Sequence, residues 1–127
     1  MVRSIILIID DEPEHRDILA RLLRSYGYDV VEATPSKACD LASIRRPHLI
    51  LCSLSLPGQP LWETVRQLHA FAELTAVPVL GSTVYTTLIK RSWVQAIGGI
   101  DYVEKPFDLD RLVERVTTLL PAAPMTA

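Results

Sequence analysis

The sequence predicts an α/β fold in which one parallel sheet is covered by helices on both faces. Short apolar runs recur at even spacing along the 127 residues. The first and third runs are continuously apolar, which is typical of strands that are buried on both faces. Helical periodicity separates the runs, and strict alternation of strands and helices indicates a parallel sheet.

Five apolar runs are the expected strands, at residues 5–9, 30–31, 49–52, 77–80 and 102–103. Right-handed crossovers leave few strand orders, and for five strands we expect the flavodoxin-like order 2-1-3-4-5. The sequence therefore predicts a flavodoxin-like (βα)5 domain with a doubly wound, five-stranded parallel sheet. This domain spans residues 1–120, and a loose Pro/Ala tail follows at residues 121–127.

A helix is expected after each strand. The first begins at Pro13, which suits a first helical turn, and stops at Gly27. Thr34 is the expected N-cap of the second helix, and Asp108 that of the last. The fourth helix is expected at about residues 85–97. Apolar faces are expected in the first helix at Ile18, Leu19, Leu22 and Leu23, and in the last at Leu109, Leu112, Val113, Val116 and Leu120.

Composition excludes several classes of function. The net charge is −2 and the charges are mixed, so no basic stripe indicates a nucleic-acid surface. No apolar run approaches a membrane span, and the start does not resemble a signal peptide, so a cytoplasmic protein is expected. Cys39 and Cys52 do not form a disulfide framework and are expected to be reduced thiols.

Polar residues end the expected strands at the edge where open parallel sheets form their sites. They are Asp10 and Asp11 after the first strand, Ser53 after the third, Thr83 after the fourth and Lys105 after the fifth. Adjacent carboxylates need a nearby cation, which either Mg²⁺ or the Lys105 ammonium could supply. Each residue alone is typical of a loop or a helix cap, as His15 is of a solvated helix. Their combination indicates a site.

Four segments resemble the receiver domain of two-component response regulators. They are residues 6–13, 47–58, 78–83 and 98–107, in the family's order and spacing. In that family an aspartate ending the third strand attacks a phosphoryl group from a histidine kinase, and an acid pair helps to hold Mg²⁺. The resemblance implies that the acid pair is Asp10 and Asp11, the hydroxyl switch Thr83, the rotating aromatic Tyr102 and the phosphate-binding ammonium Lys105.

Ser53 stands where the family's nucleophilic aspartate stands. No Asp or Glu lies between Asp40 and Glu63, so no shift of the frame supplies one. A carboxylate is ionised at neutral pH, whereas a serine hydroxyl is neutral and needs a base to attack phosphorus. Mg²⁺ would also lose a charged ligand. We therefore expect a pseudo-receiver that is not an enzyme, needs no cofactor and binds Mg²⁺ weakly.

Three alternatives remain open at this stage. Ser53 could be an unusual phosphoacceptor of an ordinary regulator, or an engineered replacement of an aspartate. A small hydrolase with Asp10 as the nucleophile is a third, although the Asp-x-Asp pattern of such phosphatases is missing.

The resemblance also implies a protein partner, which is a histidine kinase, an output domain or a second copy in a homodimer. The expected contact is the face of the fourth helix, fifth strand and last helix, with Trp93 and Tyr102 as candidate anchors. The alternative, which is slightly favoured, is that Trp93 is a partly buried residue of the fourth helix. No direct contact with nucleic acid or membrane is expected.

Overall fold

The computed structural model describes residues 3–10, 12–53, 60–70, 77–83, 99–104 and 108–120. Its strands are β1 (Ile5–Ile9), β2 (Asp29–Ala33), β3 (Leu49–Ser53), β4 (Val79–Thr83) and β5 (Gly99–Glu104). Its helices are α1 (Pro13–Ser25), α2 (Ala38–Arg45), α3 (Pro60–Ala70) and α5 (Leu109–Leu119), with a 3-10 turn, η1 (Pro35–Lys37), before α2. Within these ranges no helix is long and apolar enough to cross a membrane.

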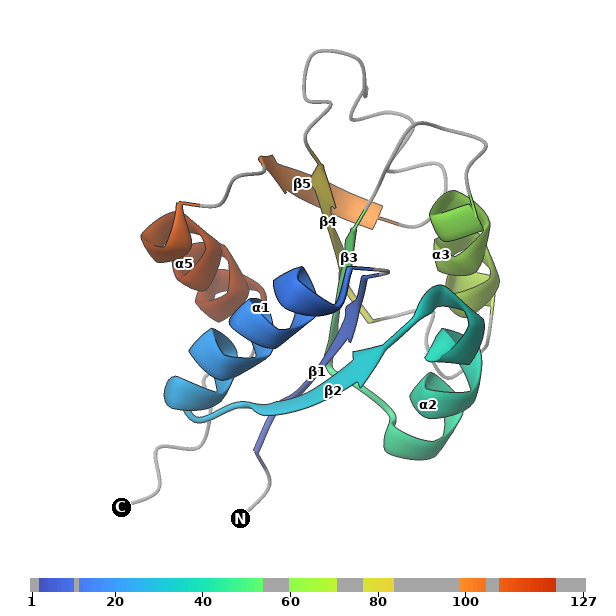
Figure 1. Cartoon of the computed structure of the whole chain (residues 1–127), viewed down its shortest axis with the longest axis horizontal. Helices are drawn as coiled ribbons and strands as arrows, with labels where there is room; N and C mark the ends of the chain where they lie inside the picture. The colour runs from blue at the N-terminus through green and yellow to red at the C-terminus, as the bar shows by residue number, and fades with distance from the viewer. Residues whose placement is uncertain are drawn as a thin grey trace.

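The strands form one parallel sheet in the order β2-β1-β3-β4-β5 (Figure 1). β1 is flanked on both sides, because Ile6 pairs with Val30 of β2 and with Leu49 of β3. Between β4 and β5 the register shifts at Val79 and Leu80. The prediction of a flavodoxin-like α/β fold with a parallel sheet is confirmed. The helix predicted at residues 85–97 lies outside the described residues.

Helices cover both faces of the sheet, α1 and α5 on one side and α2 and α3 on the other (Figure 1). Successive side chains of a strand point to opposite faces. Ile6 and Ile8 of β1 accordingly belong to the apolar cluster under α1 and α5, whereas Leu7 and Ile9 belong to the cluster under α2 and α3. This two-sided burial is the reason that β1 is apolar throughout.

The predicted limits of α1 are confirmed. Pro13 occupies its first turn, and Gly27 follows its end with a φ of +91° that favours glycine. The N–H of Gly27 donates to the carbonyl of Arg24 (3.0 Å), and the N–H of Tyr28 donates to the carbonyl of Leu23 (3.3 Å). These two bonds form a Schellman motif, which satisfies the last carbonyls of the helix.

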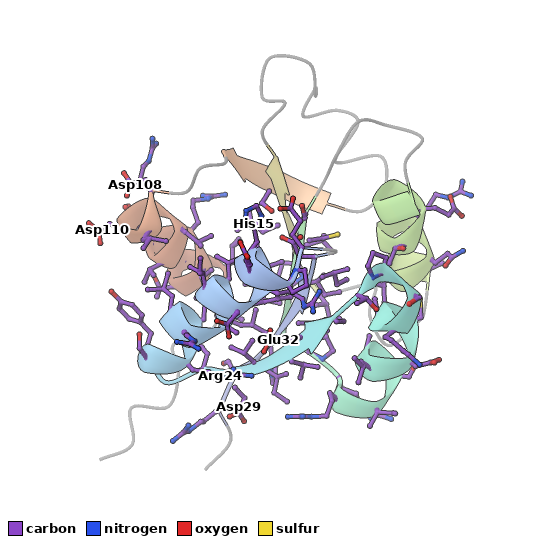
Figure 2. All side chains as sticks on the ribbon, viewed as in Figure 1. His15, Arg24, Asp29, Glu32, Asp108 and Asp110 are labelled. Carbon is purple, nitrogen blue, oxygen red and sulfur yellow. The ribbon has the colours of Figure 1, made fainter. Side chains whose placement is uncertain are left out.

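One of the two predicted N-caps is confirmed and the other is wrong. Asp108 Oδ1 accepts from the backbone N–H groups of Asp110 (3.1 Å) and Arg111 (3.3 Å) at the start of α5, as expected (Figure 2). Thr34 makes no side-chain cap bond. Its Oγ1 lies 3.2 Å from Ser36 Oγ instead, and the chain forms η1 before α2 begins.

Two predicted core residues are also wrong. Ile18 is 55% exposed and Leu109 is 42% exposed. The buried stripe of α1 is formed by Leu19, Ala20 and Leu23, so Ile18 lies beside the stripe rather than on it. Leu109 is the first residue of α5, ahead of the buried residues Leu112, Val113 and Val116.

Candidate functional site

The ends of β1 and β3 lie side by side at the carboxyl edge of the sheet. Ile9 of β1 pairs with Cys52 of β3, so the residues that follow them, Asp10 and Ser53, are neighbours across the two strands. Ser53 is the last residue of β3, is half-buried and pairs with Ser82 of β4. The structure therefore brings the predicted acid and the predicted serine to one edge.

Asp10 is buried and firmly positioned. Its side chain is 1% exposed, and its Oδ1 accepts from the backbone N–H of Glu12 at 2.9 Å. Its own N–H donates to the carbonyl of Ala33 at 3.2 Å, and its carbonyl accepts from Arg16 Nη1 at 2.7 Å. A buried carboxylate is tolerated only where such bonds replace lost water. Asp10 is thus held between β1, β2 and the start of α1.

Two arginines of α1 surround Glu32 of β2 and strengthen this arrangement. Arg16 Nε lies 4.0 Å from Glu32 Oε1, and Arg24 Nη2 lies 3.6 Å from Glu32 Oε2. Arg24 Nη2 also donates to the carbonyl of Val30 at 3.1 Å. Figure 2 shows Arg24 and Glu32 on the side of the molecule where α1 runs along β2. These contacts tie α1 to the edge strand beside Asp10.

A second group of potential ligands adjoins Asp10. One ligand atom each of Asp10, Glu12 and His15 lie within 4.8 Å of one another. His15 Nδ1 is 3.5 Å from Glu12 Oε2 and 4.0 Å from Asp10 Oδ2. Figure 2 shows His15 at the start of α1, beside the ends of the central strands. The sequence predicts a solvated helix residue near the acid pair, and the His15 side chain is 41% exposed, but its Nδ1 is buried close to two carboxylates.

Two further predicted residues are placed by their backbones. Thr83 ends β4 and pairs with Glu104, whereas Tyr102 of β5 pairs with Gly81. Thr83 therefore lies at the same edge of the sheet as Ser53. The other three predicted residues, Asp11, Trp93 and Lys105, lie outside the described residues.

Both cysteines are free thiols. Cys52 is fully buried in the cluster under α2 and α3, where it packs as a small apolar side chain. Cys39 is partly buried. Burial and the neighbouring Asp40 carboxylate raise the pKa of the Cys39 thiol.

The comparison with known families now decides the family. The model of the response regulator receiver domain matches residues 6–117. The chain belongs to this receiver family. It is 30% identical to the protein PilH of Pseudomonas aeruginosa over 116 residues, which cover 91% of this chain and 96% of PilH. It is also 31% identical to the phosphate regulon transcriptional regulatory protein PhoB of that species, but spans only 53% of PhoB.

Solved receiver structures match the whole sheet-and-helix arrangement. The chemotaxis response regulator CheY4 of Vibrio cholerae superposes with a TM-score of 0.84 at 23% identity, over 94% of this chain and 100% of that one, which shows the fold. The receiver domain of the sensor histidine kinase PA1611 of Pseudomonas aeruginosa gives a TM-score of 0.81 at 25% identity, over 93% of this chain and 98% of that domain. That structure holds a magnesium ion in its active-site cleft.

Proposed function

We propose that this receiver domain signals through protein contacts and does not carry a phosphoryl group in the ordinary way. One observation carries the proposal: β3 ends in Ser53 at the carboxyl edge of the sheet, next to the buried Asp10. By family resemblance, this is the position of the aspartate that receives the phosphoryl group.

The chemistry of a hydroxyl explains the loss of transfer. A carboxylate attacks phosphorus as an anion, but a serine hydroxyl must first give its proton to a base. Asp10 is the nearest described carboxylate by register, and its Oδ1 already accepts the N–H of Glu12. A serine phosphate is also a monoester, which lacks the ready hydrolysis of an acyl phosphate. The domain is accordingly proposed not to be an enzyme and to need no cofactor.

Magnesium binding is proposed to be weak for the same reason. Receiver domains bind Mg²⁺ in their active site, as the PA1611 domain does. Here Asp10 and Asp11 remain as oxygen ligands, but Ser53 offers a neutral hydroxyl in place of a carboxylate. Mg²⁺ dehydrates reluctantly and depends on anionic oxygen ligands to do so. Lys105 is the proposed partner of the acid pair when no metal is bound.

Receiver domains act on other signalling proteins, and this one is proposed to bind a histidine kinase, an output domain or a second copy in the cytoplasm. The proposed contact is the face of β5, α5 and the residues between β4 and β5, with Trp93 and Tyr102 as anchors. The named output activities of longer relatives, such as transcriptional regulation by PhoB, support a signalling role.

The test is exposure of the full chain to acetyl phosphate, or to beryllofluoride, with Mg²⁺. We expect no mass adduct and no change in the amide NMR shifts of the site. Ser53→Asp is the matched variant, and it is expected to respond to beryllofluoride because the other family positions are present. Label in a form that alkali cleaves and hydroxylamine traps would overturn the proposal, and an acid-stable phosphate on Ser53 would instead support the alternative phosphoacceptor.

A further inference from the structure

We propose that Asp10, Glu12 and His15 form a binding site for a divalent transition-metal ion of the zinc class. Their ligand atoms converge at the point where β1 gives way to α1. The set differs from the family's magnesium ligands, because Glu12 and His15 replace the second acid and the end of β3. This zinc-class site shares Asp10 with the proposed function but uses neither Ser53 nor its chemistry.

The first support is the state of His15 Nδ1. This atom is buried and has no hydrogen-bond partner among the residues that the structure describes. It faces two carboxylate oxygens, Glu12 Oε2 at 3.5 Å and Asp10 Oδ2 at 4.0 Å. Both distances exceed those of an N–H···O bond, so the pair of acids does not satisfy the ring nitrogen by hydrogen bonding. A metal ion between the three atoms would satisfy it.

The second support is the spacing of the ligand atoms. Zinc bonds to histidine and carboxylate are about 2.1 Å long, which places neighbouring ligands of a tetrahedron about 3.4 Å apart. The separation of His15 Nδ1 from Glu12 Oε2 is 3.5 Å, close to this value. An octahedral Mg²⁺ ion would need neighbouring ligands about 2.9 Å apart, and it prefers oxygen to imidazole. Asp10 Oδ2 lies 4.0 Å from His15 Nδ1, and the exposed side chains of Glu12 and His15 are the ones that would move to close the set around it.

The third support is that one ligand, Asp10, is rigidly held while the other two, Glu12 and His15, are accessible to an ion from solvent. Asp10 is 1% exposed and fixed by the bonds described above, so one ligand is in place before the metal arrives. The side chains of His15 and Glu12 are 41% and 63% exposed, which leaves a path for the ion and room for water as a fourth ligand. The helix N-terminus disfavours a cation, but two carboxylates offset it. The guanidinium of Arg16 is matched by Glu32.

Isothermal titration of the full chain with Zn²⁺ measures the site, with the ring signals of His15 followed by NMR. Free thiols also bind zinc, so the background variant is Cys39→Ser, and Cys52 is buried. We expect one site, a shift of the His15 ring signals and at most partial displacement by excess Mg²⁺. His15→Asn and Glu12→Gln should each weaken zinc binding by at least about tenfold.

Glu14→Gln is the matched control, because Glu14 is an exposed acid in the same helical turn but is not one of the three ligands. Its zinc affinity should stay within about twofold, since it removes the same charge without removing a ligand. Circular dichroism checks that each variant is folded. Zinc affinity that is unchanged in His15→Asn and Glu12→Gln would overturn the proposal, as would zinc binding no tighter than that of Mg²⁺.

The two proposals fail in different experiments. Ser53→Ala should leave the zinc affinity unchanged, because Ser53 is not one of the three ligands. A phosphodonor adduct on the unaltered chain would overturn the proposed function without touching the zinc result. Loss of zinc binding in Ser53→Ala would show instead that the metal sits at the family's magnesium position.

Discussion

The ends of β1 and β3 are neighbours in the sheet but differ in chemistry. β1 runs into Asp10, a buried anion whose side chain accepts from Glu12 and whose backbone bonds to Arg16 and Ala33. β3 ends in Ser53, a neutral and half-buried hydroxyl. The contrast teaches that the same sheet edge positions an anionic and a neutral side chain on neighbouring strands. Fewer like charges at the edge also means less mutual repulsion in the absence of metal.

The largest expected effect places a negative charge at the end of β3. Ser53→Asp should raise the affinity for Mg²⁺ by at least about tenfold, because the ion gains an anionic oxygen ligand beside Asp10. Titration of Mg²⁺ against amide NMR shifts measures this change. Ser53→Asn is the control of similar size without charge, and it should bind no better than the unaltered chain. Equal affinity in all three would show that Ser53 does not face the acid pair.

Topology explains why this edge could be predicted. β1 was predicted at its observed bounds because it is apolar on both faces, and parallel pairing then places the residues after β1 and β3 together. β4 was predicted too early, at residues 77–80. It runs instead through Gly81, Ser82 and Thr83, and the weak strand propensity of Gly81 is overridden by pairing with strands on both sides.

The group around His15 could not be predicted in the same way. The contact of His15 with Asp10 depends on the angle at which α1 leaves β1, and the apolar pattern says nothing about that angle. The contacts of Arg16 with the Asp10 carbonyl and with Glu32 have the same origin, since they join a helix to two different strands. Patterns of burial therefore predicted the edge, but not the polar contacts that complete it.

The next largest effect tests how firmly the β1 end is held. Arg16→Gln removes the donor to the Asp10 carbonyl (2.7 Å) and the neighbour of Glu32, and should lower the free energy of unfolding by about 1–2 kcal/mol. Arg21→Gln on the same helix removes only an exposed pair with Asp17 and should change it by less than about 0.5 kcal/mol. Urea unfolding of both variants provides the comparison. Equal losses would contradict the view that Asp10 is anchored by Arg16.

A smaller effect concerns repulsion at the edge. Without Mg²⁺, Ser53→Asp should lower the free energy of unfolding by about 1 kcal/mol, because a second carboxylate is placed next to buried Asp10. Saturating Mg²⁺ should reverse the loss, since only the folded state binds the ion. Thermal melts with and without Mg²⁺ measure both steps, and Ser53→Asn is again the control of similar size without the charge. A loss of the same size in Ser53→Asn would assign it to packing rather than to charge.

The smallest expected effect lies at the other end of the sheet, at Tyr28, which precedes β2 and is buried under α1. Burial raises the pKa of Tyr28, so its contribution to stability is complete below the ordinary value of about 10 and is lost as pH rises through the folded value. In a Cys39→Ser background, Tyr28→Phe should therefore flatten the fall in unfolding free energy above pH 10, by at most about 1.4 kcal/mol per pH unit. The variant should leave Mg²⁺ binding unchanged, because the amino and carboxyl edges of a parallel sheet lie at opposite ends of its strands. A change in Mg²⁺ affinity would show that the amino and carboxyl edges of the sheet are coupled through β2. The difference between the ends of β1 and β3 would then depend on residues outside the carboxyl edge.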